Sequence, residues 1–344
     1  MSLVQDNVKD ILEKAPEEEL NIHLTPMLAT LVDAPFDDSG WEYEIKWDGY
    51  RALAFINGEE SVLKSRNNIS FNVKFFPVFE AIKNWPVNAV VDGEIVVVNE
   101  KGISDFGSLQ NWRGAADGEL LFYVFDILWL EGKNLTGLPL SDRKAVLQSI
   151  FPKEGLIRNG YSIESNGISF FEAAEKLGLE GIMAKKSDSL YFPGIRTKDW
   201  LKIKIHKRQE VVIGGYTRNK GTSKLFSSLL LGVYEGNIFK YVGKVGTGFK
   251  DKQQKEMLEI FKPLVTDRNP FNKMPEYNKP NGYRPNPVAN AIWLQPTVVC
   301  EVSFTEVTSD GVFRHPSFEG LREDKKAKEV VREVEKPVKE LIKS

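Results

Sequence analysis

The sequence predicts an α+β protein with mainly antiparallel sheets, followed by a small β-barrel of the OB-fold type. Strand-like stretches dominate residues 41–205, and the helical patterns between them show no regular strand–helix alternation. Short strands separated by glycine-containing turns follow residue 207. With 344 residues, the chain is long enough for two domains.

Residues 1–20 predict a short peripheral helix or a fraying arm. Val4, Val8, Ile11 and Leu12 recur at helical spacing, and the acidic run 17–19 follows them. We therefore separate this segment from the first domain.

The first predicted domain spans residues 21–206. Its expected strands are Trp41–Trp47, Arg51–Ile56, Val90–Val98, Phe122–Trp129, Gly181–Lys185 and Leu201–Ile205. Its expected helices are Lys74–Lys83, Ser141–Ser149 and Phe170–Leu177. Gly178 follows the last helix as a stop signal.

The second predicted domain spans residues 207–344 and contains the barrel. Its expected strands are Val211–Thr217, Leu229–Tyr234, Ile238–Val245 and Thr297–Thr305. A stretch rich in proline and asparagine lies between the last two of these, and a charged helix is expected from Lys325 onward.

Charge is distributed unevenly along the chain. The formal net charge is only −2. Between Lys185 and Lys224, however, eleven lysine and arginine residues face three acidic ones. A local basic field of this kind is suited to phosphate, so this stretch is the predicted contact with nucleic acid.

The remaining composition predicts a cytoplasmic protein that makes no contact with a membrane. Cys300 is the only cysteine, which fits a reducing compartment, and the three histidines are too scattered to predict a zinc site. The polar, acidic start predicts no secretory signal, and no apolar run reaches the roughly 20 residues of a membrane helix.

The stretch from Trp41 to Phe55 has two interpretations. Its alternating apolar and charged residues predict a half-buried strand, and Asp48-Gly49 predicts a hairpin turn, which would leave Lys46 as a solvated strand lysine. Alternatively, Lys46 is a nucleophile. An amine, a carboxylate and the guanidinium of Arg51 would then lie together, a set suited to a nucleotide phosphate and its ribose.

Six further motifs favour the second interpretation. They are Ser65-Arg66, Asp92-Gly93-Glu94, Phe125-Asp126, Glu180-Gly181, Lys202-Ile203-Lys204 and Arg322-Glu323-Asp324-Lys325. With the Lys46 motif, this ordered set closely resembles the motifs of ATP-dependent DNA ligases over about residues 22–330. Local strings such as VGKVGTGF and GLREDK are similar to the ligase domain of bacterial ligase D, the end-joining type.

The resemblance implies an adenylation domain followed by an OB-fold domain, and a reaction in three steps. Lys46 attacks the α-phosphate of ATP to give lysyl-AMP, AMP passes to the 5′-phosphate of a DNA break, and the 3′-hydroxyl then displaces AMP. Mg²⁺ or Mn²⁺ is the implied metal, with Glu94 and Glu180 as its ligands. The implied nucleotide-binding residues are Glu44, Ile45, Arg51, Arg66, Glu94, Phe125, Met183, Arg196, Lys202, Lys204, Arg322, Asp324 and Lys325.

Within that set the resemblance assigns several roles. Glu44 contacts the adenine edge, Phe125 stacks on the base, and Lys202 and Lys204 hold the α-phosphate. The motif that begins at Arg322 closes over ATP from the second domain, which requires a hinge near residues 206–208.

The implied partner is nicked or broken double-stranded DNA, contacted mainly through its phosphates. A Ku-like end-binding protein is a candidate partner. A monomer in the bacterial cytoplasm, associated with the nucleoid, is expected.

From the residues alone, other enzymes with the lysine motif and a non-catalytic binding protein stay open as alternatives. Capping guanylyltransferases and RNA ligases share the lysine motif, although the Arg322–Lys325 string and the barrel favour a DNA ligase. A non-catalytic nucleic-acid-binding protein of the OB type is a third class. That class gives no reason for Lys46, Glu94 and Glu180 to occur together.

Overall fold

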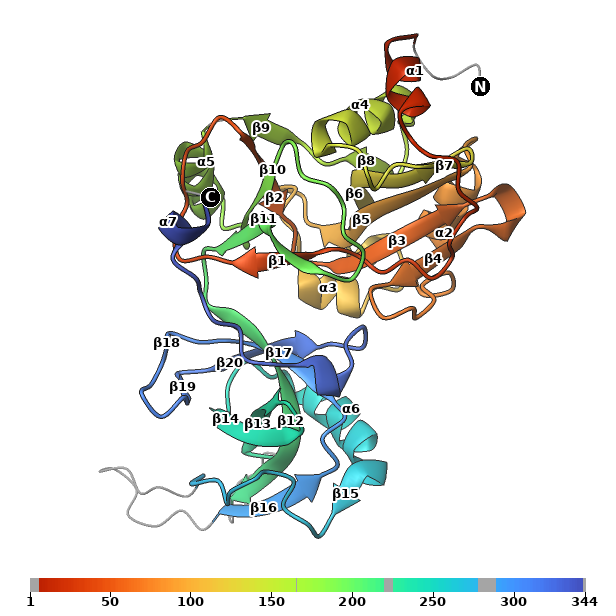
Figure 1. Cartoon of the computed structure of the whole chain (residues 1–344). Helices are drawn as coiled ribbons and strands as arrows, with labels where there is room; N and C mark the ends of the chain where they lie inside the picture. Colours follow the sequence, from red (N-terminus) through yellow and green to blue (C-terminus); the bar gives the residue numbers. More distant parts are fainter. Residues whose placement is uncertain (1–5, 165, 220–224, 278–288, 343–344) are drawn as a thin grey trace. The chain divides into compact units, whose positions relative to one another are not determined.

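The computed structural model describes residues 6–164, 166–219, 225–277 and 289–342. The chain forms two units (Figure 1). The first contains Met1–Ile205 together with Val334–Ser344, and the second contains His206–Glu333. The predicted α+β class with mainly antiparallel sheets is confirmed.

A five-stranded sheet in the first unit carries the Lys46 segment. Its strands, in spatial order, are β1 (Leu28–Leu31), β11 (Arg196–Lys204), β10 (Gly181–Lys186), β2 (Trp41–Lys46) and β9 (Ser162–Glu164). All neighbours pair antiparallel except β1 and β11. Trp41 and Tyr43 of β2 are buried as the period-2 pattern predicts, but Glu42 and Glu44 between them are only 6% and 4% exposed, so the predicted half-buried strand is buried on both faces.

A six-stranded sheet forms the other layer of the first unit. Its main path is β4 (Val62–Ser65), β3 (Tyr50–Ile56), β5 (Ala89–Val98), β6 (Glu119–Leu130) and β7 (Lys133–Asn134), and β8 (Ile157–Asn159) pairs parallel with β6. One face packs on the largest apolar core, and the other face shares a smaller core with Met27, Tyr191 and Trp200 from outside this sheet.

Helices lie around these sheets (Figure 1). They are α1 (Asp6–Glu13), α2 (Phe76–Lys83), α3 (Phe106–Gln110), α4 (Leu140–Ile150) and α5 (Gly167–Lys176). Helix α4 packs on β6 and α1 packs on α4, with Val8 of α1 buried. Gly178 has φ +72°, so the predicted helix stop after α5 adopts the left-handed conformation that glycine tolerates best.

The predicted hairpin at Asp48-Gly49 is wrong. Strand β2 pairs with β9 and β10, whereas β3 pairs with β4 and β5, so the chain crosses from one sheet to the other at this point. A Cβ atom at Gly49 would lie 2.2 Å from the backbone oxygen of Ile95, so only glycine allows this crossing. As a result, Lys46 is the last residue of β2 in one sheet, and Arg51 is the second residue of β3 in the other.

The second unit is a curled half-barrel of seven strands, built where the sequence predicts a barrel. The strands are β12 (Arg208–Asn219), β13 (Ser228–Glu235), β14 (Ile238–Val245), β15 (Val265–Thr266), β16 (Ala289–Leu294), β17 (Val299–Ser303) and β20 (Ser317–Leu321). Strand β12 pairs with β17 through its first half and with β16 through its second half, which curls the sheet around an apolar core.

Smaller elements complete the second unit. They are α6 (Asp251–Phe261), the two-stranded ribbon of β18 (Glu306–Val307) and β19 (Phe313–Arg314), and the 3-10 turns η3 (Lys262–Leu264) and η4 (Ala327–Glu329). The first unit has two such turns, η1 (Gly58–Glu60) and η2 (Ala115–Asp117). Helix α6 is absent from the sequence-based prediction. None of the helices in the described part of the chain could span a membrane.

The predicted charged helix from Lys325 is also wrong, and the segment after it belongs to the first unit rather than the second. In the described residues from Lys325 to residue 342, the helical elements are limited to η4 and the four-residue α7 (Val338–Leu341). The Lys336 N–H donates to Leu31 O at 3.0 Å, and Asp33 N–H donates to Lys336 O at 3.2 Å. Val338 is buried with Leu341 and Ile342 in the core beneath the five-stranded sheet. Backbone pairing to the edge strand β1 and this apolar burial therefore replace a helix.

Candidate active site

Three neighbouring strands place most of the predicted nucleotide residues on one face of the five-stranded sheet. Strand β10 pairs antiparallel with both β2 and β11, and residues directly opposite each other share a face. Residues two apart in one strand also share a face. Five predicted side chains meet both conditions: Glu44, Lys46, Met183, Lys202 and Lys204.

Lys46 has a carboxylate partner within hydrogen-bond distance. Its Nζ donates to Glu180 Oε2 at 2.5 Å, and the two side chains are 19% and 6% exposed. Glu180 directly precedes β10, whose first residue lies opposite Lys46. A partly exposed amine beside a carboxylate able to orient it and receive its proton is an arrangement that suits a nucleophile.

Arg51 is held rigidly at the start of the second sheet. Its Nε and Nη2 donate to the two carboxylate oxygens of Asp92 at 2.9 and 2.6 Å, and its Nη1 donates to Met27 O at 2.6 Å. Burial favours loss of its proton, but Asp92 outweighs this effect and raises the pKa of Arg51 above its ordinary value. Arg51 therefore remains a fixed cation.

Tyr191 forms a hydrogen bond with Asp92, the carboxylate that holds Arg51. Its hydroxyl donates to Asp92 Oδ2 at 2.7 Å and accepts from the Met27 N–H at 3.0 Å. Burial and the neighbouring Asp92 raise the pKa of Tyr191 well above its ordinary value, so the hydroxyl stays protonated. This residue is thus a positioning group for Arg51.

Replacing Tyr191 with phenylalanine is expected to lower the free energy of unfolding by about 1–3 kcal/mol, because a buried carboxylate oxygen and a buried N–H lose their partner. Urea unfolding followed by fluorescence measures the change. Tyr161→Phe is the matched control, since Tyr161 is 71% exposed and should change stability by less than about 0.5 kcal/mol. Equal effects of the two variants would contradict the role assigned to Tyr191.

Glu94 on β5 and Phe125 on β6 belong to the same six-stranded sheet as Arg51 on β3. Glu94 is directly opposite Arg51 on β3 and Tyr123 on β6, and it is half-buried. Phe125 is half-buried, and its ring makes an edge contact with Trp200, with a 6.3 Å separation of centroids. Both positions agree with a site between the two sheets.

Three predicted residues lie apart from this arrangement. The side chain of Ile45 points to the face of β2 opposite Lys46 and packs in the core with Ile182. This side chain therefore does not lie on the face that carries the other nucleotide residues. Arg66 directly follows β4 and is half-buried. Arg196 is exposed at the far end of β11, where its guanidinium donates to Ala29 O.

Of the predicted metal ligands, Glu94 lies on β5 of the six-stranded sheet, and Glu180 directly precedes β10 of the five-stranded sheet. Among the described residues, no group of three or more histidine, cysteine, aspartate or glutamate side chains is arranged to hold a metal ion. Magnesium commonly takes one or two carboxylates and draws its other ligands from phosphates and water. The available carboxylates therefore fit a metal that arrives with a nucleotide.

The predicted residues of the second unit form their own charged cluster. Arg322 donates through Nε and Nη2 to the two carboxylate oxygens of Asp324 at 2.9 and 3.0 Å, and it lies 3.6 Å from Glu301. Lys325 Nζ lies 2.8 Å from Glu210 Oε1. Burial alone would raise the pKa of Glu210, but Lys325 and Arg322 outweigh it and lower that pKa to about 2.

This cluster predicts a pH-dependent stability of the second unit. Because the folded pKa of Glu210 lies below its unfolded value, the ionised carboxylate stabilises the fold above about pH 5, and this contribution is lost as the pH falls toward about 2. The difference in unfolding free energy between wild type and Glu210→Gln should therefore be smaller at pH 3 than at pH 7. Glu259→Gln, at an exposed position of α6, should show no such trend. A constant difference for Glu210→Gln would contradict this linkage.

Two lysines that the prediction of the nucleotide site omits also belong to the first unit's site. Lys144 of α4 and Lys185 of β10 each lie 2.6 Å from an oxygen of Glu44. Lys185 stands in the basic stretch expected to contact DNA, but it is only 1% exposed, so that expectation is wrong for this residue. No local pattern marks Lys144, which is about 100 residues from Glu44 in sequence.

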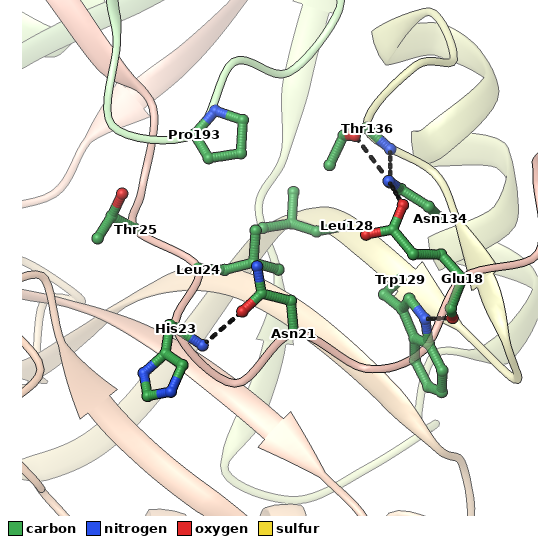
Figure 2. A pocket seen from close by; sticks show the side chains of 10 residues that line it. All are labelled: Glu18, Asn21, His23, Leu24, Thr25, Leu128, Trp129, Asn134, Thr136 and Pro193. Carbon is green, nitrogen blue, oxygen red and sulfur yellow. Dashed lines mark hydrogen bonds between the residues drawn. The ribbon is translucent and has the colours of Figure 1, made fainter.

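A cavity of about 270 Å³ lies elsewhere in the first unit (Figure 2). Its walls come from the segment before β1, from β6, from the end of β7 and the loop after it, and from Pro193. The polar groups drawn in Figure 2 largely satisfy one another: Trp129 Nε1 donates to Glu18 O at 2.8 Å, and Asn134 Nδ2 donates to Glu18 Oε2 at 2.6 Å. None of the predicted site residues lines this cavity.

Comparison with known families gives two matches. Residues 26–204 match the ATP dependent DNA ligase domain, and residues 222–325 match the ATP dependent DNA ligase C terminal region.

Comparison with individual proteins also finds DNA ligases. The chain is 36% identical to the multifunctional non-homologous end joining protein LigD of Mycolicibacterium smegmatis, over 96% of this chain and 43% of that protein. It is 30% identical to DNA ligase C of Mycobacterium tuberculosis, over 85% of this chain and 87% of that protein. The chain thus spans less than half of the LigD relative.

A solved structure of mycobacterial DNA ligase D complexed with ATP and MES aligns with a TM-score of 0.64 and 32% identity. The alignment covers 91% of this chain and all of the other.

Proposed function

Since the chain belongs to the ATP-dependent DNA ligases, we propose that it seals 5′-phosphate/3′-hydroxyl breaks in double-stranded DNA through a covalent lysyl-AMP intermediate. The observation that carries the proposal is the contact of Lys46 with Glu180, on a sheet face that also presents Glu44, Lys202 and Lys204.

In the first step, the Lys46 amine forms a bond to the α-phosphorus of ATP, and the bond to pyrophosphate breaks. Glu180 is within reach to orient the amine and to accept its proton. Lys202 and Lys204 neutralise the phosphate charge that grows during attack. A divalent cation held by Glu94 or Glu180 would add charge neutralisation at the phosphates when bound.

The remaining steps transfer AMP to the 5′-phosphate and then join the strands. Arg51 supplies a fixed cation beside the site, and Phe125 supplies an aromatic face for the adenine. Arg322, Asp324 and Lys325 act in the first step from the second unit. That role requires a movement about residues 206–208, where the chain passes between the units.

End joining is the proposed biological setting, with a Ku-like end-binding protein as a candidate partner and the bacterial cytoplasm, at the nucleoid, as the location. The LigD relative of Mycolicibacterium smegmatis, named as a multifunctional non-homologous end joining protein, supports this setting. The enzyme is proposed to act as a monomer. Sealing of nicks and of double-strand ends, with and without added Ku, would separate a nick-repair role from an end-joining role.

The central test is covalent labelling. The protein is incubated with α-labelled ATP or GTP and Mg²⁺, denatured and separated by electrophoresis, and then assayed on nicked DNA. Label from ATP together with a sealed nick is the expected result. Label from GTP alone would favour a capping enzyme, and no label from either nucleotide would overturn the proposal.

A further inference from the structure

Four charged side chains form a neutral buried cluster beside the nucleotide face. Glu44 Oε1 lies 2.6 Å from Lys144 Nζ, and Glu44 Oε2 lies 2.6 Å from Lys185 Nζ. Lys144 also contacts Glu42 Oε2 at 2.5 Å. Strand β2 contributes both carboxylates, while α4 and β10 contribute one lysine each. Both oxygens of Glu44 are therefore fixed from two directions.

This cluster is costly if its role is only structural. Removing an ion from water costs several kcal/mol even after relaxation, and apolar replacements of buried ion pairs are often as stable or more so. Glu44 and Lys185 are 4% and 1% exposed. Their hydrogen-bond geometry is incomplete, because Glu44 Oε1 and Lys185 Nζ have ion-pair contacts but no partner of ordinary hydrogen-bond geometry. Glu44 shares its strand face with Lys46, so the carboxylate that the two lysines hold belongs to the nucleotide face.

Lys185 also contacts the aromatic wall of the site. Its Nζ lies 4.0 Å from the centroid of the Phe125 ring and 4.3 Å from that of Trp200. A desolvated cation over an aromatic face is attracted by the electrons of the ring. The guanidinium carbon of Arg51 also lies over this ring, 5.5 Å from its centroid, so the two cations limit where a base can stack on Phe125. One lysine therefore fixes both the ring and the carboxylate.

The two lysines determine the chemical character of Glu44. Burial alone would raise the pKa of Glu44, but Lys144 and Lys185 outweigh burial and lower it. An ionised carboxylate only accepts hydrogen bonds. The 6-amino group of adenine donates, whereas the 6-oxo group of guanine accepts, so guanine at this position would oppose two acceptors.

We propose that Lys185 and Lys144 are positioning residues that set the base selectivity of the site, by fixing Glu44 as an acceptor and Phe125 as a stacking surface for adenine rather than guanine. This inference rests on the proposed function, since it concerns the nucleotide that labels Lys46.

The test compares the rates of covalent labelling of wild type, Lys185→Met and Lys144→Met with α-labelled ATP and GTP. For both variants, the ATP-to-GTP ratio of kcat/KM is expected to fall by at least about tenfold, mainly through a higher KM for ATP. Lys185→Arg keeps the charge and should recover part of the ratio. Lys186→Met is the control, because Lys186 is the next residue and points to the opposite face of β10.

Two results would overturn the inference. One is an unchanged ATP-to-GTP ratio in both methionine variants. The other is a proportional loss of labelling with both nucleotides, which is the signature of a purely structural role. If Lys185→Met does not fold, Lys144→Met and Glu44→Gln, compared by the same ratio, decide the question. A wild type that takes no label would instead contradict the proposed function itself.

Discussion

Replacing Lys46 with alanine is expected to reduce covalent labelling by ATP by at least about 10⁴-fold, because the attacking group itself is removed. Lys46→Arg should fail equally, since a guanidinium is not deprotonated in proteins. Electrophoresis of the denatured protein after incubation with labelled ATP measures the effect.

Lys64→Ala is the control for this prediction. Lys64 also lies on a strand of the first unit, but its amine donates to Ile22 O at 3.1 Å, and the residue directly opposite it on β3 is Leu53, which is not a predicted nucleotide residue. Its labelling should be unchanged. A DNA strand already carrying 5′-AMP should still be sealed by Lys46→Ala, because the last step does not use the amine. Retained labelling in Lys46→Ala would assign the nucleophile elsewhere.

Replacing Arg143 with methionine is expected to have the largest effect on stability, a loss of about 3–5 kcal/mol in the free energy of unfolding. Arg143 donates to both oxygens of Asp126 at 2.8 Å, and both side chains are completely buried. Its Nη1 also donates to Leu138 O and Ser189 O. Without Arg143, the Asp126 carboxylate becomes an uncompensated buried charge. Urea unfolding of the purified variant gives the measurement.

Two comparisons test the cause of that loss. Arg158→Met removes an exposed arginine that lies 3.9 Å from Glu119, and it should cost less than about 1 kcal/mol. The double variant Asp126→Leu/Arg143→Met removes both charges and should recover part of the stability, because no isolated ion remains. A double variant less stable than Arg143→Met alone would show that the buried charge is not the cause.

The same ion pair marks a limit of the sequence-based prediction. Asp126 follows Phe125 in a motif associated with nucleotide binding, yet its carboxylate binds Arg143 and so ties α4 to β6. The register of β6 shifts at this motif, so simple alternation does not assign its side chains to one face or the other. Nothing in the local sequence identifies Arg143 as the partner of Asp126.

Local patterns predicted the strands that carry the site, because apolar residues alternate wherever one face is buried. The grouping of Glu44 and Lys46 on one face follows from the same alternation. The crossing at Gly49 was not predictable, because Asp-Gly is as compatible with a hairpin as with a link between sheets. Lys144 was not predictable either, since its contact depends on how α4 packs.

The return of residues 334–342 to the edge of β1 has a consequence for biosynthesis. Val338 completes the core under the five-stranded sheet, yet it follows the whole second unit in sequence. During translation, the second unit must emerge from the ribosome before the first can be completed. Until then, the edge of β1 and the apolar surface that covers Val338 remain open to other chains. An exposed strand edge and an exposed apolar surface favour contacts with other chains, so we expect fragments that stop at residue 205 to aggregate more readily than the full chain.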